Sequence, residues 1–449
     1  MKKIINLLLL LLLCSSCIIF TSCSDDDSNT EQKNDQTVVL NVYNWGEYIS
    51  DGFQGSLDVN AEFEKYYYEK YGVKLKVNYT TYPTNEDMYS KLKSGAGSYD
   101  IVIPSDYMIQ KMIEEDMLLS YDVTKLENYK YINNSFRGLY YDKEECYSVP
   151  YTYGMLGVIY NTALVDPADY EGKSWELLWN EKYDGKILQF NNPRDAFGTA
   201  MYRNPSPDDP SLDINSTDPK VWDKALERLL EQKPLLQGYV NDEIYNKMTT
   251  ASAAIAPYFA GDFITMSESN EDLAFYYPVE GTNLFVDAMC ILKNARQPEI
   301  AKEYINFMLT EEIAVANAIY IGYASPNTLV ANNGVYNEVY YEEMGEDALN
   351  ILYSARPDEI NAAYNAKYGT TSYKSFTPEI QAYVNTLWEE LKTENSTEIW
   401  VHIFTFVIVG AVLTLAIYST YTKKTRSKDY RTRDKLANAE KRKKQANKT

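Results

Sequence analysis

The sequence predicts an α/β body followed by one membrane-spanning helix, and three observations carry this prediction. Short apolar strand-like runs alternate with amphipathic helix-like segments through the middle of the 449-residue chain, a pattern typical of α/β architecture. The first residues combine a positive start with a leucine-rich run, as secretion signals do. Residues 399–421 contain no Lys, Arg, Asp or Glu and are long enough to cross a bilayer.

The start of the chain is expected to be a lipoprotein signal peptide over residues 1–23. Its apolar run ends in small residues before Cys23, an arrangement that resembles the lipobox of bacterial lipoproteins, in which this cysteine carries the lipid. Cys17 is a rival cleavage site, and an ordinary signal peptide or an uncleaved anchor are the alternatives. Residues 24–37 are polar and acidic without periodicity, so we expect a flexible tether.

The other end of the chain sets the topology. Trp400, Tyr418 and Tyr421 lie near the ends of the apolar segment, where aromatic rings favour the membrane interface. Residues 422–449 are rich in Lys and Arg, and by the positive-inside rule this tail is cytoplasmic. The body is therefore expected on the outer side of the membrane. Binding of RNA or lipid head groups by the tail is an alternative that the topology does not require.

Composition excludes several classes of function. The formal net charge is −21 although the tail is basic, so the body is strongly acidic; this excludes nucleic-acid binding by the body. An acidic surface attracts cationic partners, or it serves solubility. The sole histidine, His402, lies in the membrane segment, which leaves the body without a histidine-based nucleophile or zinc site. Whether Cys146 and Cys290 pair is left open.

The elements of the body are expected in alternating order. The first strand is expected to end near Tyr43, and Asn85 is the expected N-cap of the second helix. Strands are expected at 37–45, 73–82, 99–105, 147–161, 186–190 and 252–259, with two more around a turn at Gly281. Helices are expected at 58–72, 85–95, 106–118, 174–180, after 192, at 220–231 and, as one long helix, at 298–319.

Six motifs occur in order along this body: "YNWGEYI", "NEDMYSKLKSGAGSYDIVIPSDYMIQKM", "SVPYTYG", "FVDAMCI", "AKEYINFML" and "IGYASPN". With them the chain resembles the spermidine/putrescine-binding receptors of bacterial ABC importers, of the type II periplasmic binding-protein class, from about Leu40 to Leu391. The resemblance implies two α/β lobes, a hinge and a central cleft that closes on a linear polyamine, without catalysis, cofactor or metal. The implied division is lobe 1 over 38–148, lobe 2 over 149–286, and a return to lobe 1 with helices crossing both lobes over 287–398.

The resemblance also implies the residues of the ligand site. It carries over Trp45, Glu47, Tyr48, Ser105, Tyr107, Asn192, Asp195, Phe259, Asp262, Phe285, Asp287 and Tyr323. A diammonium ion needs a carboxylate at each end and aromatic faces along its methylenes. Asp287 and Asp262 are the expected primary amine anchors, with Asp195 and Glu47 as supplements.

Three points of the site stay open from the sequence. Glu47 is a third anchor or a solvated neighbour. Tyr258 competes with Phe259 for one aromatic place. The last position of the family's site, near Tyr373 and Lys374, has no assigned counterpart.

Two departures from the family bear on the ligand. Asn192 stands where relatives carry an acid, and Phe285 stands where many carry Trp, which is the better cation–π partner. We therefore expect a short diamine such as putrescine to be preferred over spermidine. The membrane helix is a further departure, because together with Cys23 it would anchor the receptor at both ends.

The expected partners are the polyamine, an ABC permease with its ATPase subunit, and the membrane, but no nucleic acid. The same fold also serves amino acids, sugars and metal ions, so another small solute is the alternative ligand. A ferric-iron receptor would need clustered His and Tyr ligands, and the body has no His. An enzyme or a sensor on this fold is a further alternative, but the sequence shows no reactive constellation and no signalling domain.

Overall fold

The computed structural model describes residues 37–344, 351–352, 372–393, 408–409, 412–414 and 418. The predicted signal peptide with Cys23, nearly all of the tether, most of the apolar segment and the basic tail lie outside these residues. Within the described part of the chain, no helix is both long enough and apolar enough to span a membrane.

The described strands form one mixed nine-stranded sheet, in the order β2-β1-β3-β9-β4-β7-β5-β6, with β8 also paired to β4. The strands are β1 (Val38–Trp45), β2 (Leu75–Tyr82), β3 (Ile101–Val102), β4 (Ser148–Asn161), β5 (Ile187–Phe190), β6 (Leu236–Val240), β7 (Ile255–Phe259), β8 (Leu273–Tyr276) and β9 (Leu284–Ile291).

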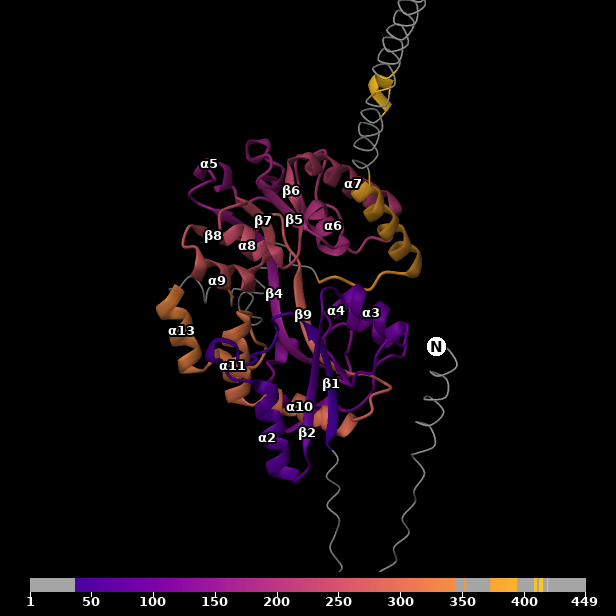
Figure 1. Cartoon of the computed structure of the whole chain (residues 1–449), viewed down its shortest axis with the longest axis vertical. Helices are drawn as coiled ribbons and strands as arrows, with labels where there is room; N and C mark the ends of the chain where they lie inside the picture. The colour runs from indigo at the N-terminus through magenta and orange to yellow at the C-terminus, as the bar shows by residue number, and fades with distance from the viewer. Residues whose placement is uncertain are drawn as a thin grey trace, which may run out of the picture.

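Two long antiparallel strands connect two lobes. The first half of β4 pairs with β9, and its second half pairs with β7 and β8. The end of β9 pairs with β3, which in turn is parallel to β1. Figure 1 shows β4 and β9 running side by side from the lobe of β1 and β2 (lobe 1) into the lobe of β5, β6 and β7 (lobe 2).

Helices cover both lobes (Figure 1). Those of lobe 1 are α2 (Val59–Tyr71), α3 (Asn85–Lys93), α4 (Asp106–Glu114), α10 (Pro298–Met308) and α11 (Glu311–Ile321). Those of lobe 2 are α6 (Pro193–Tyr202), α7 (Pro219–Gln232), α8 (Glu243–Thr249) and α9 (Ala260–Ser269). Shorter or peripheral helices are α5 (Pro167–Tyr170), α12 (Thr328–Ala331), α13 (Gly334–Met344) and a helix at 378–393 beside α7.

Several predicted boundaries are wrong. Strand β1 spans Val38–Trp45, and Trp45 pairs with Tyr82 of β2. The end of the predicted range 37–45 is therefore confirmed, and the alternative end near Tyr43 is wrong. The strand expected at 99–105 has only two residues, because Pro104 has no N–H for the ladder. The helix expected at 174–180 is a 3₁₀ turn over Trp175–Trp179.

Two helix predictions fail at their ends. Thr84, not Asn85, is the N-cap of α3, since its side chain accepts from the backbone N–H of Asp87. The long helix expected at 298–319 is two helices, because Thr310 adopts an extended conformation between α10 and α11. A β-region residue at this point begins a new helix and interrupts the old hydrogen-bond ladder.

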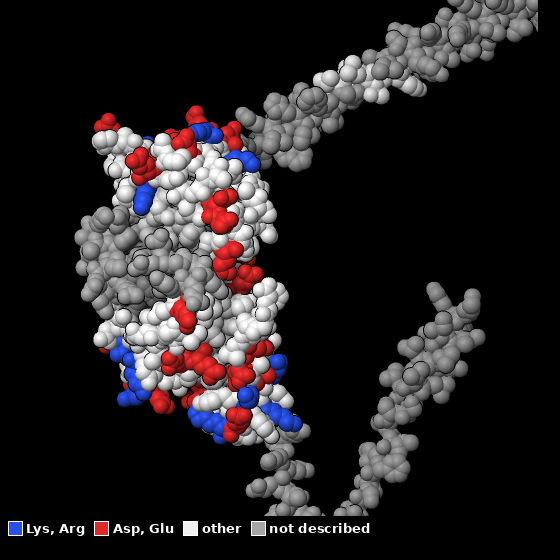
Figure 2. All heavy atoms as spheres, turned by 90° about the vertical axis from the view of Figure 1, so that its left-hand side faces the viewer, with Lys and Arg blue, Asp and Glu red and all other residues white. Residues whose placement is uncertain are grey.

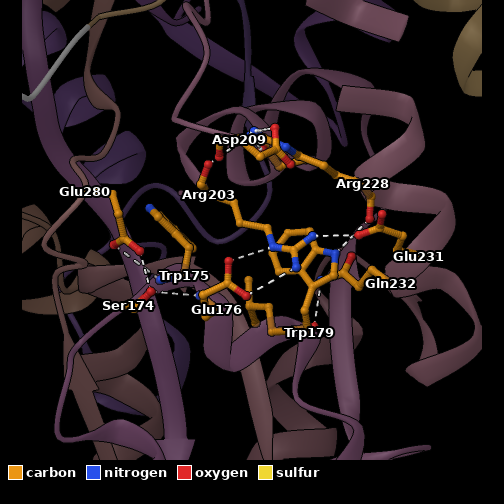
Figure 3. A network of polar contacts seen from close by, with 12 residues as sticks. Ser174, Trp175, Glu176, Trp179, Arg203, Asp209, Arg228, Glu231, Gln232 and Glu280 are labelled. Atoms are coloured by element: carbon orange, nitrogen blue, oxygen red, sulfur yellow. Dashed lines mark hydrogen bonds and ion pairs between the residues drawn. The ribbon is translucent and has the colours of Figure 1, made fainter. Parts of the chain in front are cut away.

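A buried arginine organises lobe 2. Arg228 is 1% exposed, and its guanidinium donates to the carbonyls of Ala200 and Arg203, each at 2.8 Å. It also donates to the Asp209 carboxylate at 2.6 Å and to the Pro210 carbonyl at 2.7 Å. Figure 3 shows Arg228, Arg203 and Asp209 within one polar network. The network fixes the proline-rich loop after α6 against α7.

Charge is unevenly distributed over the surface. Figure 2 shows Asp and Glu on both lobes beside the middle of the molecule, while Lys and Arg gather toward its two ends. On this face Asp and Glu also lie at both ends, so acidic side chains border the middle of the molecule without being confined to it.

Candidate functional site

A cleft of about 840 Å³ lies between the lobes. The sheet topology explains its position, because β1 is parallel to β2 and β3, while β5 is parallel to β6 and β7. The residues that follow the carboxyl ends of these strands line the cleft from both sides. Ligands of α/β proteins bind beyond such strand ends.

All twelve residues that the sequence predicted line this one cleft. Lobe 1 contributes the members at the ends of β1 and β3, namely Trp45, Glu47, Tyr48, Ser105 and Tyr107. Lobe 2 and the connecting strands contribute Asn192, Asp195, Phe259, Asp262, Phe285 and Asp287, and Tyr323 follows α11. Their sequence separation is large, so the fold brings them together.

Asp287 on β9 is the most buried of the predicted acids, at 4% exposure. Its Oδ2 accepts a hydrogen bond from the Tyr48 hydroxyl at 2.8 Å, and Tyr48 also contacts Thr152. Its Oδ1 has no hydrogen-bond partner among the described residues. Burial raises the pKa of Asp287 to about 6, while hydrogen bonds from Ser105 and Tyr48 lower it. The carboxylate is therefore held at Oδ2, while its Oδ1 is buried and lacks a hydrogen-bond partner among the described residues.

Asp262 lies in the first turn of α9, on lobe 2. Its Oδ2 accepts from the Tyr323 hydroxyl. Burial raises the pKa of Asp262 to about 7, and the hydrogen bond from Tyr323 opposes this rise. The ring of Tyr323 lies 5.6 Å from that of Tyr48 and 5.8 Å from that of Phe285, so aromatic faces connect the surroundings of Asp262 and Asp287.

Asp195 lies in the first turn of α6, next to its N-cap Asn192. The Asn192 Oδ1 accepts from the Asp195 backbone N–H at 2.8 Å, and its Nδ2 donates to the Asp195 carboxylate at 3.0 Å. Burial raises the pKa of Asp195 to about 6, and the bond from Asn192 lowers it. Asn192 thus caps the helix and orients the acid, in addition to lining the cleft.

The turn after β1 presents Trp45 and Glu47. The Trp45 ring lies 4.8 Å from that of Tyr82, and its indole nitrogen is buried without a partner among the described residues. Glu47 is exposed and adopts a left-handed φ of 51°, which is uncommon for a residue other than glycine. At the end of β7, both candidates for the one predicted aromatic position, Tyr258 and Phe259, line the cleft.

The polar and aromatic cleft residues that sequence reasoning did not assign to the site include Glu86, Asp106, Arg194 and Tyr373. Asp106 is 1% exposed, its Oδ2 has no partner among the described residues, and burial raises its pKa well above the usual range. Its position directly after β3, between two predicted site residues, was the available signal.

Arg194 and Tyr373 form an aromatic and cationic side of the cleft. The Arg194 guanidinium lies 4.3 Å from the Tyr107 ring centre, 5.0 Å from that of Tyr373 and 3.5 Å from that of Phe376. It donates to the Lys374 carbonyl at 2.8 Å. The resemblance placed the last site position near Tyr373 and Lys374 without assigning it, and in the structure Tyr373 lines the cleft.

The arrangement suits a small cation better than an anion. The acids of the lining are Glu47, Glu86, Asp106, Asp195, Asp242, Glu243, Asp262 and Asp287, and Arg194 is the one basic residue among its described members. Within the described residues there is also no cluster of His, Cys, Asp and Glu arranged to hold a metal ion. Cys146 and Cys290 are both free thiols.

Comparisons with known proteins identify relatives of similar sequence. The spermidine/putrescine-binding periplasmic protein of Escherichia coli K12 is 30% identical over 294 residues, which are 65% of this chain and 79% of the relative. A protein of the same description from Haemophilus influenzae is 31% identical over 303 residues, 66% of this chain and 77% of its own length. A putrescine-binding periplasmic protein of E. coli is 24% identical over 305 residues, 64% of this chain and 78% of that relative.

Solved structures show the same fold. The spermidine/putrescine ABC transporter substrate-binding protein of Streptococcus pneumoniae is 32% identical, with a TM-score of 0.60 over 79% of this chain and 99% of that one. A structure from Listeria monocytogenes is 31% identical, with a TM-score of 0.65 over the same shares. The family described as "Bacterial extracellular solute-binding protein" matches residues 60–339. This chain belongs to the family of bacterial extracellular solute-binding proteins.

Proposed function

We propose that the protein is the polyamine receptor of an ABC importer. It captures a linear diammonium ion in the cleft by closure of the two lobes and delivers it to a permease with its ATPase subunit. The observation that carries this proposal is the Asp287 carboxylate, which is buried, oriented by Tyr48 and without a hydrogen-bond partner at Oδ1 among the described residues. A buried carboxylate without a cationic partner is costly, and an ammonium group would supply both the charge and the hydrogen bond.

The second support is the separation of acids along the cleft. Asp262 and Asp195 lie on different helices of lobe 2, and Asp287 lies on β9 between the lobes. Several buried carboxylates, with aromatic rings between them, match a chain that carries more than one ammonium group. The names of the similar receptors, which mention spermidine and putrescine, agree with this ligand class.

Within this class we propose putrescine as the preferred ligand over spermidine. The side chain of Asn192 caps α6, and because its amide is neutral it brings no charge to the cleft. Phe285 is a weaker cation–π partner than Trp. Both features reduce the attraction for a third ammonium group. A putrescine-binding relative at 24% identity is consistent with the short diamine.

We also propose that Cys23 and residues 399–421 anchor the receptor to the outer face of the cell membrane. The support is the sequence: a lipobox-like cysteine near one end and an uncharged apolar segment before a basic tail at the other. Fractionation of cells that produce the full chain tests this. We expect the protein in the membrane fraction, released only by detergent; release by a salt wash would contradict the anchoring.

Titration calorimetry of the full chain in detergent tests the ligand. The panel is putrescine, cadaverine, spermidine and spermine, together with amino acids and sugars. We expect binding of polyamines with putrescine tightest. Heat with an amino acid or a sugar but with no polyamine would assign the cleft to another solute. Tighter binding of spermidine would retain the receptor and overturn the preference.

A further inference from the structure

We propose that Glu86 is a second ligand-binding carboxylate at the Asp195 end of the cleft. It would hold one ammonium group from lobe 1 while Asp195 holds it from lobe 2. This inference rests on the proposed function and names a residue that the sequence motifs did not single out. Its chemistry is recognition of the second charged end of an α,ω-diammonium ion.

The position of Glu86 follows from the end of β2. The chain leaves this strand at Tyr82, Thr84 caps α3, and Glu86 is the second residue of the helix. Its neighbour Asn85 is 3% exposed and donates to the hydroxyl oxygens of Ser105 at 3.0 Å and Tyr107 at 3.1 Å. Asn85 therefore ties the start of α3 to the residues that follow β3, at the edge of the cleft.

The carboxylate of Glu86 is oriented by a tyrosine. The Tyr107 hydroxyl donates to the Glu86 Oε1 at 3.1 Å, and both residues line the cleft. The ion pairs of the described chain do not include Glu86. As with Tyr48 and Asp287, a tyrosine hydroxyl fixes one oxygen of a cleft carboxylate, and no cationic side chain neutralises it.

Asp195 on α6 of lobe 2 and Glu86 on α3 of lobe 1 line the same cleft. The negative charge of Glu86 raises the pKa of Asp195, after burial as the larger cause, so the two acids are electrostatic neighbours. Arg194 lowers the pKa of Asp195, but its guanidinium is packed among three aromatic rings and donates to a carbonyl. Two like charges that face each other across a cleft repel, and a bound cation between them removes the repulsion.

The pair explains how the cleft tolerates Asn192. This residue caps α6 and supplies no charge, and Glu86 supplies the second negative charge from the opposite lobe. An ammonium group between Glu86 and Asp195 would contact both lobes, so its binding favours the closed arrangement. The other ammonium group would lie near Asp287, whose buried Oδ1 lacks a hydrogen-bond partner among the described residues.

The test compares two isosteric variants of the full chain by titration calorimetry with putrescine. Glu86→Gln removes the charge and keeps the shape; Asp87→Asn removes a charge from the next residue of the same helix, which is exposed and does not line the cleft. We expect Glu86→Gln to weaken putrescine binding by roughly tenfold or more, and Asp87→Asn to change it by less than about twofold. Melting temperatures without ligand verify that both variants fold.

A second ligand distinguishes the Asp287 end of the cleft from the Glu86 and Asp195 end. N-acetylputrescine has one ammonium group, so in the wild type it should bind more weakly, and it should lose less affinity than putrescine on Glu86→Gln. Equal putrescine affinity of Glu86→Gln and wild type would overturn this inference and leave the receptor function in place. Equal losses in Glu86→Gln and Asp87→Asn would reduce the effect to overall charge and also overturn it. If the wild type binds no diamine at all, both the function and this inference fail.

Discussion

The hydroxyl of Tyr48 donates to Oδ2 of Asp287 at 2.8 Å, while Oδ1 of the same carboxylate has no partner among the described residues. Tyr48 lies just after β1 and Asp287 on β9, so this bond joins the first strand of lobe 1 to a strand that crosses between the lobes. A buried carboxylate that is fixed at one oxygen and lacks a hydrogen-bond donor at the other is prepared for a cationic ligand. Preorganisation of this kind reduces the entropy that binding must otherwise cost.

The first prediction concerns this pair. Asp287→Asn keeps the shape but removes the buried charge, and we expect putrescine affinity to fall by roughly a hundredfold or more. Tyr48→Phe keeps the charge but removes the orienting bond, and a loss of about tenfold is expected. Asp272→Asn, at an exposed acid outside the cleft, is the matched control and should bind as the wild type does. Calorimetry at one pH and one ionic strength makes the comparison.

A second prediction follows from the raised pKa values of the cleft acids, about 6 for Asp287 and Asp195 and about 7 for Asp262. Near pH 5 these groups are largely protonated, and an ammonium group must displace their protons. The amines of the ligand, with pKa values of about 10, stay charged. Putrescine affinity is therefore expected to fall by roughly tenfold or more from pH 8 to pH 5. Heats measured in phosphate and in Tris should differ near pH 6.5, because binding releases protons. Equal heats in both buffers and a constant affinity would contradict this.

The same acids set the pH dependence of the unliganded protein. The pKa values of these acids in the folded state lie above the usual 3.8. At pH values between 3.8 and these raised pKa values, the folded protein therefore binds more protons than the unfolded chain. Their contribution to stability is full below about pH 4 and is lost as the pH rises through 6 and 7. We expect putrescine to raise the melting temperature more at pH 8 than at pH 5.5. A larger rise at pH 5.5 would count against the assignment of these acids to the site.

The cleft shows which site residues could be predicted from the sequence alone. The sequence predicted twelve residues that lie together in it, because strand ends and ordered motifs are local features. Glu86 and Asp106 were not predicted as site residues, because each lies at the start of a helix, where an acid is common for electrostatic reasons alone. Tyr373 was named only as lying near an unassigned position, because its place depends on contacts with Tyr140 and Arg194, which are far away in the chain.

The errors in the fold have similar causes. The break between α10 and α11 has neither Gly nor Pro, so the helical pattern continues across it. The end of β1 was placed too early because Tyr43, Trp45 and Tyr48 cannot all lie on one face of a strand, whose faces repeat every two residues. In the structure both residues do belong to β1, with Tyr43 buried and Trp45 at the cleft. Tertiary context decides such boundaries, and local pattern does not.

A third prediction tests the support of the aromatic wall. A Cβ atom at Gly261 would lie 2.5 Å from the Tyr323 ring, which is too close. Gly261→Ala should therefore displace Tyr323 from Asp262 and weaken putrescine binding by roughly tenfold. Gly238→Ala is the control, because nothing lies within 4 Å of its Cβ position. If the Gly261 variant folds and binds as tightly as the control, Tyr323 does not position Asp262 for the ligand.

A fourth prediction concerns stability and not binding. Arg228→Met removes the donors for three carbonyls and for Asp209 in lobe 2. Breaking a buried ionic network on one side costs about 3–5 kcal/mol, so we expect a marked loss of unfolding free energy in urea. Lys224→Met removes an exposed partner of the same acid, at 3.7 Å, and should cost less than about 1 kcal/mol. Similar losses in both variants would show that the buried network contributes little.

The most direct test of the proposed polyamine site is a crystal structure of the body with putrescine. We predict that one ammonium nitrogen lies within about 3 Å of Asp287 Oδ1 and that the second lies between Asp195 and Glu86. The methylenes of putrescine should lie against the aromatic rings of the cleft. Putrescine bound elsewhere, or bound in the cleft without contact to Asp287, would contradict it.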